Sequence, residues 1–137
     1  MRLGACLGVP LDIIEPCGFV WNDQKLRRAG MDYVEIANVT RHLSWEKFCQ
    51  TQTRQSSRLI LLDAHAETSF LEFAFCSSDI LLLGQESVGV PSTVVNQVDA
   101  SVTIPMVKGC RSLNMAISAA MVLTEALRQT NQFPKGE

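Results

Sequence analysis

The stretch LLLGQESVGVP (residues 81–91) joins a run of leucines to a polar loop that begins and ends with glycine. A second stretch, IPMVKGCRSLNMA (residues 104–116), has the same outline: a short apolar run, a glycine-bearing polar loop and a helix start. Ligands of parallel sheets bind beyond the carboxyl ends of the strands. Glycine lets a main chain approach a ligand closely because it carries no Cβ. Both loops are therefore candidate ligand-binding loops.

Short apolar runs alternate with helical patterns along the whole chain. Strands are predicted at residues 10–14, 32–37, 58–62, 79–83 and 101–104. Helices are predicted at residues 23–29, 45–50, 91–98 and 112–130, a polar connector at 52–57, and residues 67–76 fit neither pattern clearly. Apolar strands that alternate with helices are typical of a parallel sheet covered on both faces. The sequence thus predicts an α/β fold in one domain, residues 1–137.

Several residues are predicted to begin these helices. Ser44 and Ser112 are suited to cap the helices that follow them, because a serine oxygen accepts a hydrogen bond from a free helical N–H group. Pro91 suits the first helical position, with Val94, Val95 and Val98 on one face.

Composition excludes several classes of protein. The chain has 137 residues, 47% of them hydrophobic and 19% charged, which is ordinary for one globular domain. No apolar run is long enough to cross a membrane, and the N-terminus lacks the features of a signal peptide. The five cysteines are scattered without a CxxC pair, so neither a metal site nor a disulfide framework is expected. We expect a cytoplasmic protein.

The charge is unevenly distributed. The net charge is −2, but residues 25–58 carry seven lysines and arginines against three acids. A local basic face suffices to bind phosphates, although such residues are also ordinary on solvated helices and loops. Both interpretations stay open at this point.

The last predicted helix, SLNMAISAAMVLTEALRQT, has apolar or small residues around most of its circumference. A helix of that kind is buried on most sides. In a chain of this size a second copy is the simplest cover, so we expect a two-fold homodimer through this helix.

Standard nucleotide and hydrolase signatures are absent. The sequence has no GxGxxG, no GxxxxGK[ST] and no GxSxG. His42 and His65 are interpreted as surface or loop residues rather than catalytic bases. Glu86 lies inside the first glycine loop, where it either orients an arginine or ligand or binds loop N–H groups. The strand ends at Leu62, Gly84 and Ile104 remain the candidate ligand positions.

The two loops resemble signatures of a known family. LLLGQESVGVP is similar to the second signature, and IPMVKGCRSLNMAISAA to the third, of the SPOUT class of RNA methyltransferases. The segment IIEPCGFVWNDQKLRRAGMDYVEIANVTRH (residues 13–42) resembles the small subgroup that methylates the ribose 2′-hydroxyl at the tRNA wobble position, the TrmL type. The resemblance covers essentially the whole chain.

This resemblance implies a fold and a cofactor site. It implies a SPOUT-type parallel sheet flanked by helices, with a C-terminal deep trefoil knot, an exception to the rule against threading. It also implies S-adenosylmethionine as the cofactor, held mostly by backbone groups. The implied cofactor residues are Leu62, Gly84, Ile104, Met106, Ser112 and Leu113, and Glu86, Gly89 and Asn114 are further motif positions.

The resemblance also implies the chemistry. Arg2 matches the arginine of the first signature and is the implied catalytic residue. The asparagines of that signature are missing, so the chain is expected to be N-terminally truncated relative to the family. The implied RNA contacts are Lys25, Arg27, Arg28, Arg41 and Arg111, on the anticodon stem-loop of tRNA. Relatives often have tyrosine where this chain has Thr124, and no metal is implied.

Two functional hypotheses follow. The first is an enzyme that transfers a methyl group from S-adenosylmethionine to the ribose 2′-hydroxyl of the tRNA wobble nucleotide. The alternative is a truncated, non-catalytic knotted dimer that binds RNA or a nucleoside. Which tRNAs and which wobble base are used cannot be read from the sequence.

Overall fold

The computed structural model describes residues 2–15, 38–84, 90–110 and 113–136. The chain divides into two compact units, residues 1–50 with 133–137, and residues 51–132. The expectation of one domain over residues 1–137 stays a prediction.

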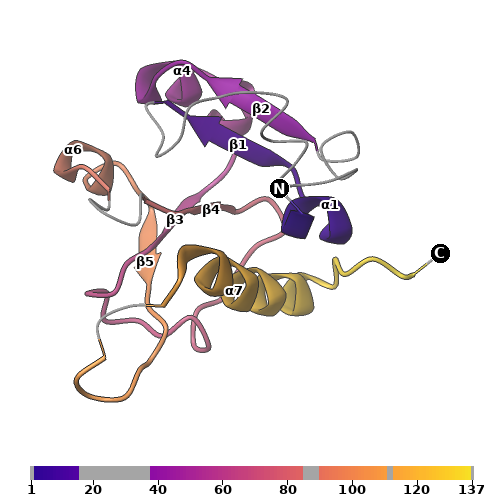
Figure 1. Ribbon diagram of the computed structural model, residues 1–137. Coiled ribbons are helices and arrows are strands. Elements are labelled where there is room, and N and C mark those ends of the chain that lie inside the picture. Colours follow the sequence, from indigo (N-terminus) through magenta and orange to yellow (C-terminus); the bar gives the residue numbers. More distant parts are fainter. Residues whose placement is uncertain (1, 16–37, 85–89, 111–112, 137) are drawn as a thin grey trace. The chain divides into compact units, whose positions relative to one another are not determined.

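The first unit contains helix α1 (Arg2–Leu7), strands β1 (Leu11–Ile14) and β2 (Val39–His42), and helix α4 (Trp45–Cys49) (Figure 1). Helix α1 ends at Gly8, whose φ of 67° lies in the left-handed region that glycine adopts without strain. The Val9 N–H then donates to the Gly4 carbonyl at 2.8 Å. A Cβ at Gly4 would lie 2.7 Å from the Val9 oxygen, so this turn requires glycine there.

Strands β1 and β2 pair in parallel, with Leu11 opposite Val39 and Ile14 opposite His42. The predicted strand at 10–14 is confirmed. The predicted cap of α4 is also confirmed, since the Ser44 side chain accepts from the Lys47 N–H at 3.2 Å.

His42 corrects an interpretation made from the sequence. It is a buried residue, 8% exposed, at the end of β2, and not a surface residue. Its ring lies edge-on to the buried Phe48, and its Nε2 is 2.8 Å from the Asp12 carboxylate. Packing and a polar partner together explain why a histidine is accommodated there.

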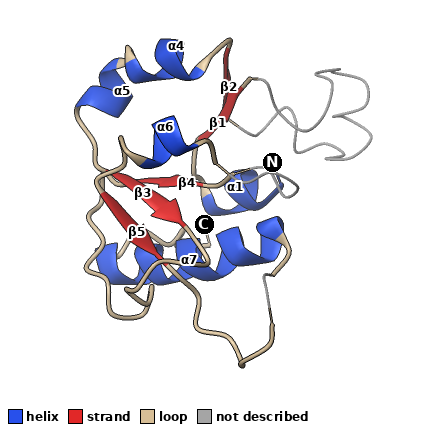
Figure 2. Ribbon diagram, turned by 90° about the vertical axis from the view of Figure 1, so that its left-hand side faces the viewer, coloured by secondary structure: helices blue, strands red, loops and turns tan. Residues whose placement is uncertain are grey.

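The second unit is built on a parallel sheet of β3 (Leu59–Leu62), β4 (Ile80–Leu82) and β5 (Ala100–Val102), in the order β4-β3-β5 (Figure 2). The expected parallel α/β arrangement is confirmed in this unit. β3 is the middle strand, and three of its four residues are buried. Strands buried on both faces read as continuous apolar runs, as LILL does here.

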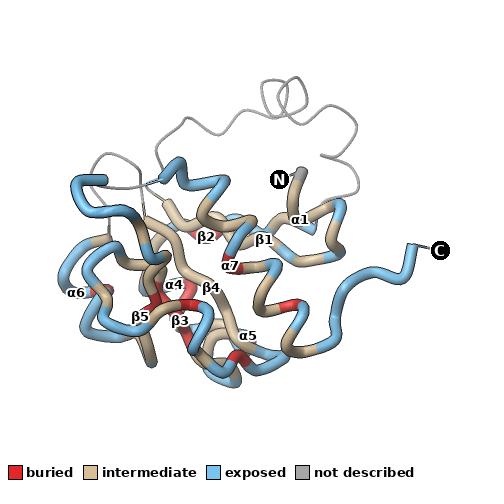
Figure 3. The backbone as a smooth tube through the Cα atoms, turned by 90° about the horizontal axis from the view of Figure 1, so that it is seen from below, coloured by how far each residue is buried: buried red, intermediate tan, exposed pale blue. Residues whose placement is uncertain are grey.

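Helix α7 (Met115–Thr130) supplies the cover of this sheet. Its Val122 joins a buried cluster with Ile60, Phe70, Phe75 and Val102. Buried residues concentrate on β3, β5 and one side of α7, while the rest of α7 is half-buried or exposed (Figure 3). Among the described residues, no helix is long and apolar enough to cross a membrane.

Three other sequence expectations of the second unit need correction. Residues 52–57 are more than a connector, because Gln52–Gln55 form the short helix α5, capped by the Thr51 side chain. Helix α6 spans only Ser92–Val95 and not residues 91–98. Pro91 is its N-cap and not its first helical residue, and Val95 is 36% exposed. Residues 67–76, which the sequence left undecided, are turns and extended chain with one bridge, Ser69 to Thr103.

The start of the long helix is the third correction. The helix begins at Met115, and its cap is Asn114, not Ser112. The Asn114 Oδ1 accepts from the N–H groups of Ala116 at 2.8 Å and Ile117 at 3.3 Å. An asparagine directly before the first helical residue satisfies both groups. The elements expected at 23–29 and 32–37 lie outside the described residues.

Candidate functional site

The ends of the three strands in the second unit bring the candidate ligand positions together. Leu61 is opposite Leu82 on one side of β3, and Leu62 is opposite Val102 on the other. Gly84 and Ile104 each follow their strand by two residues. The parallel register therefore places Leu62, Gly84 and Ile104 at the same edge of the sheet, and all three are half-buried.

The loop after β5 leaves main-chain groups open at this edge. Ile104 and Met106 are half-buried, yet their N–H and C=O groups form no hydrogen bond with another described residue. Backbone groups without a partner among the described residues can take part in hydrogen bonds to a bound ligand. A nucleoside cofactor held by backbone contacts fits these residues.

The rest of this loop projects outward. Val107 is 79% exposed, and Gly109 turns the chain with φ of 97°, so that the Cys110 N–H donates to the Val107 carbonyl at 3.1 Å. Leu113 is 40% exposed beside the cap of α7. The side chains that follow β5 are thus available to a bound molecule.

The loop after β3 was not identified from the sequence. The Asp63 carboxylate accepts from the His65 N–H at 2.9 Å, and the Ala66 N–H donates to the Asp63 carbonyl at 3.1 Å. The Thr103 hydroxyl donates to the Ala64 carbonyl at 3.4 Å. The only available signal was an aspartate directly after a buried strand, a residue that favours such turns.

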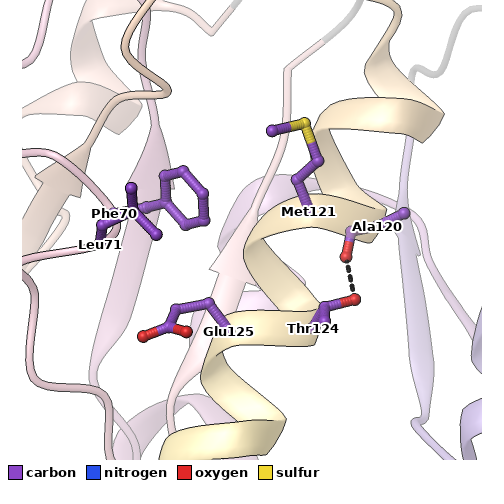
Figure 4. Close-up of a pocket in the computed structure, with 6 residues that line it drawn as sticks. All are labelled: Phe70, Leu71, Ala120, Met121, Thr124 and Glu125. Atoms are coloured by element: carbon purple, nitrogen blue, oxygen red, sulfur yellow. Dashed lines mark hydrogen bonds between the residues drawn. The ribbon is translucent and has the colours of Figure 1, made fainter.

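An open hollow lies between the loop after β3 and helix α7 (Figure 4). Phe70 and Leu71 form one side, and Met121, Thr124 and Glu125 of α7 form the other, with Ala120 beside them. The volume of the hollow is about 420 Å³. Thr124 donates to the Ala120 carbonyl at 2.6 Å, so its hydroxyl is used within its own helix.

The charge of Glu125 is stabilised at the rim of this hollow. Arg128 donates to both oxygens of its carboxylate, at 2.8 and 2.9 Å, and the Gln129 amide donates at 2.7 Å. The hydrogen bonds from Arg128 and Gln129 lower the pKa of Glu125 to about 2. Glu125 is therefore a carboxylate at neutral pH and no proton donor.

The residues expected to act on RNA are described only in part. Arg2 is the first residue of α1, and Arg41 lies in β2, both in the first unit. The Arg41 guanidinium is 2.7 Å from the Glu15 carboxylate and its side chain is 43% exposed. Lys25, Arg27, Arg28 and Arg111 lie outside the described residues, as do Ser112, Glu86 and Gly89.

In the described ranges, no group of three His, Cys, Asp or Glu side chains is arranged to hold a metal ion. What the geometry offers is a strand-end edge with open backbone groups in one half of the chain.

Comparison with known proteins decides the family. Residues 1–124 match the SpoU rRNA Methylase family. The chain belongs to this family. The expected resemblance to the SPOUT class is thereby confirmed, and the chain is a methyltransferase by family.

Individual members of the SpoU family are similar over almost the whole chain. A tRNA (cytidine(34)-2′-O)-methyltransferase of Beijerinckia indica is 48% identical over 135 residues, which cover 98% of this chain and 84% of the relative. A solved structure concerned with the 2-OH methylation of C/U34 on tRNA is 37% identical, with a TM-score of 0.85, covering 93% of this chain and 83% of that one.

A third SpoU member shows the cofactor. The methyltransferase AviRb of Streptomyces viridochromogenes, solved in complex with AdoMet, is 26% identical with a TM-score of 0.77. The match covers 93% of this chain and 53% of AviRb.

Proposed function

We propose that this chain transfers a methyl group from S-adenosylmethionine to the ribose 2′-hydroxyl of the wobble nucleotide of tRNA. The observation that carries the proposal is the shared edge of β3, β4 and β5, with open backbone groups at Ile104 and Met106, in a SpoU-family chain. The names of two similar proteins, the Beijerinckia indica methyltransferase and the solved structure for C/U34, support tRNA and this nucleotide. A tRNA substrate in turn supports a cytoplasmic enzyme.

The cofactor residues in this proposal are Leu62, Gly84, Ile104, Met106, Ser112 and Leu113. The bound cofactor supplies an activated methyl group on sulfur. The chain's own contribution is to align that group with the ribose oxygen, which converts an encounter of two molecules into a positioned reaction. Arg2 is proposed as the catalytic residue, assisting removal of the hydroxyl proton.

RNA binding is proposed to use Lys25, Arg27, Arg28, Arg41 and Arg111 on the anticodon stem-loop. Arg41 is held by Glu15, so a phosphate would share or replace that carboxylate as its partner. Phosphate contacts give affinity that falls with salt.

The proposal also includes the tertiary form of the family: a single domain over residues 1–137, a C-terminal trefoil knot and a homodimer through α7. Support for the dimer comes from apolar side chains of α7 that are exposed in the second unit. Ile117 is 54% exposed and Met121 38%. Apolar side chains of this size in a row indicate a contact surface.

The test is methylation of tRNA by the purified chain, followed by nucleoside mass spectrometry. We expect a 2′-O-methylated nucleoside at the wobble position. Arg2→Ala is expected to abolish transfer while S-adenosylhomocysteine still binds, whereas Arg128→Ala, a surface change, retains transfer. Cofactor binding without any transfer to tRNA by the wild type would reject the proposal and support a non-catalytic binding dimer.

A further inference from the structure

Asp63 is the first residue beyond β3, the middle strand of the sheet in the second unit. Its N–H donates to the Val102 carbonyl at 2.9 Å, so its backbone still belongs to the sheet. The register that pairs Leu61 with Leu82 places Asp63 level with Gly84, and the pairing of Leu62 with Val102 places it level with Thr103. Asp63 thus lies between the two neighbouring strand ends that form the proposed cofactor site.

The charge environment of Asp63 differs from that of comparable acids. Five described carboxylates are half-buried. Four have an arginine or histidine nitrogen within 2.6 to 2.8 Å, and these are Asp12, Glu15, Asp79 and Glu125. Asp63 forms no ion pair with any described residue. Half-buried charges are normally compensated, so the lack of a cation within the described part of the chain is informative.

The conformation of the Asp63 side chain is fixed by one contact. One oxygen, Oδ1, accepts the His65 N–H at 2.9 Å, while the other has no partner among the described residues. The turn through residues 63–66 is also held by Thr103, whose hydroxyl donates to the Ala64 carbonyl. A carboxylate with one oxygen anchored and one open is suited to face a cationic ligand.

We propose that Asp63 determines specificity for the charged form of the cofactor, by placing a negative charge opposite its cationic sulfur end. This inference rests on the proposed function. On transfer, the bond from sulfur to the methyl carbon breaks and its electron pair stays on sulfur. The methyl carbon bonds to the ribose oxygen, and the hydroxyl proton passes to water. The sulfur is cationic before this step and neutral after it.

As a consequence, Asp63 makes the chain bind S-adenosylmethionine, the reactant, more tightly than S-adenosylhomocysteine, the product. An attraction between Asp63 and the cationic sulfur is present for S-adenosylmethionine and absent for S-adenosylhomocysteine. Asp63 therefore favours exchange of spent cofactor for fresh cofactor. For a half-exposed charge pair the expected preference is about threefold to fivefold in dissociation constant.

The test is calorimetric titration of both compounds into the full chain and into Asp63→Asn. Asparagine keeps an oxygen that can accept the His65 N–H and removes only the charge. The dissociation constant of S-adenosylhomocysteine divided by that of S-adenosylmethionine should be about threefold smaller in Asp63→Asn than in the wild type. Binding of S-adenosylhomocysteine should change little. Glu67→Gln, which removes an exposed charge from the same loop, is the matched control and should leave the ratio unchanged.

Two results overturn the inference while leaving the proposed function intact: an unchanged ratio in Asp63→Asn, or an equal loss of affinity for both compounds. If Asp63→Asn fails to fold, Asp63→Ser is titrated instead. The wild-type ratio is also measured at low and high salt, since screening should reduce it. A ratio independent of salt counts against Asp63. A wild-type chain that binds neither compound would reject the proposed function itself.

Discussion

Arg58 joins three segments of the second unit through one side chain. Its guanidinium donates to both oxygens of Asp79, at 2.8 and 2.6 Å, and to the Ala74 carbonyl at 3.1 Å, and it lies 5.2 Å from the centre of the Phe73 ring. Burial alone would raise the pKa of Asp79. The hydrogen bond from Arg58 and that from the Cys76 N–H outweigh this effect, and the pKa lies below its ordinary value.

Replacing Arg58 by lysine keeps the charge and removes the planar fork. Because lysine cannot donate to both oxygens of Asp79 in the same plane, we expect Arg58→Lys to lower the free energy of unfolding by about 1 kcal/mol. Urea denaturation measures it. The same change in an Asp79→Asn background is the control, because the fork has lost its charged acceptor there, and equal effects in the two backgrounds would argue against the fork.

The lowered pKa of Glu125 predicts that the stability of the fold depends on pH. Its pKa is about 2 in the folded chain against an ordinary value of 4.5, so ionised Glu125 favours the folded state. This contribution is complete above the ordinary pKa and is lost as the pH falls towards about 2. The difference in stability between wild type and Glu125→Gln should therefore shrink on acidification.

Unfolding free energies of both proteins, measured from neutral to acidic pH, check this expectation. Glu72→Gln removes an exposed acid for which no ion pair is described, and serves as the control. A difference between wild type and Glu125→Gln that stays constant across the acid range would contradict the assigned role of Arg128 and Gln129.

At the scale of the element, the stability of helix α7 depends on the caps at its two ends. Asn114 caps two N–H groups at its start, and Asn131, with φ of 57°, ends it in the left-handed region. Without cofactor, Asn114→Ala should lower the free energy of unfolding by about 1 kcal/mol, because those N–H groups lose their acceptor.

Asn114→Asp is the matched comparison. It keeps the accepting oxygen and adds a negative charge at the helix start, where that charge is favourable. We expect its stability to equal or exceed that of the wild type in thermal denaturation. Loss of stability in Asn114→Asp as large as in Asn114→Ala would show that the side chain does something other than capping.

Gln129 fastens α7 to the extended chain before β4. Its amide donates to the Phe73 carbonyl at 2.8 Å and its oxygen accepts the Phe75 N–H at 2.8 Å. Gln129→Ala leaves both backbone groups unpaired beside the buried core. The expected loss in unfolding free energy is about 2 kcal/mol.

Amide hydrogen exchange measures the effect of Gln129→Ala at the hydrogen bond itself. The amide of Phe75 should exchange faster in Gln129→Ala than in the wild type, while Arg128→Ala, which removes an exposed neighbour, should leave it nearly unchanged. Unaltered exchange at Phe75 would contradict the bridging role.

At the scale of the whole molecule, the exposed side of α7 is the proposed surface of assembly. If the proposed homodimer uses this side, a carboxylate at Ile117 becomes buried without a partner in the dimer. Ile117→Glu should convert dimer to monomer in sedimentation equilibrium, and Gln132→Glu, which adds the same charge at an exposed polar position, should not. A dimer that persists in Ile117→Glu places the interface elsewhere.

The sequence predicted features that depend on neighbouring residues better than features that depend on distant contacts. The strand at 10–14, the strands at 58–62 and 79–83 and the cap at Ser44 depend on local pattern, and the structure confirms them. His42 and the cap of α7 were misjudged. A buried histidine needs a distant partner, Asp12, and the cap of α7 can be assigned to Asn114 only when the start of the helix is known.

The sequence by itself determined the alternation of apolar strands with helices, the two glycine loops and hence the family. These features are written in consecutive residues, where periodicity and motif spacing act locally. Only the tertiary structure decided which strands are neighbours, which backbone groups lack a partner among the described residues, and that Asp63 has no described cation beside it while the other half-buried acids have one. Such facts depend on contacts between residues far apart in the chain, which no local pattern specifies.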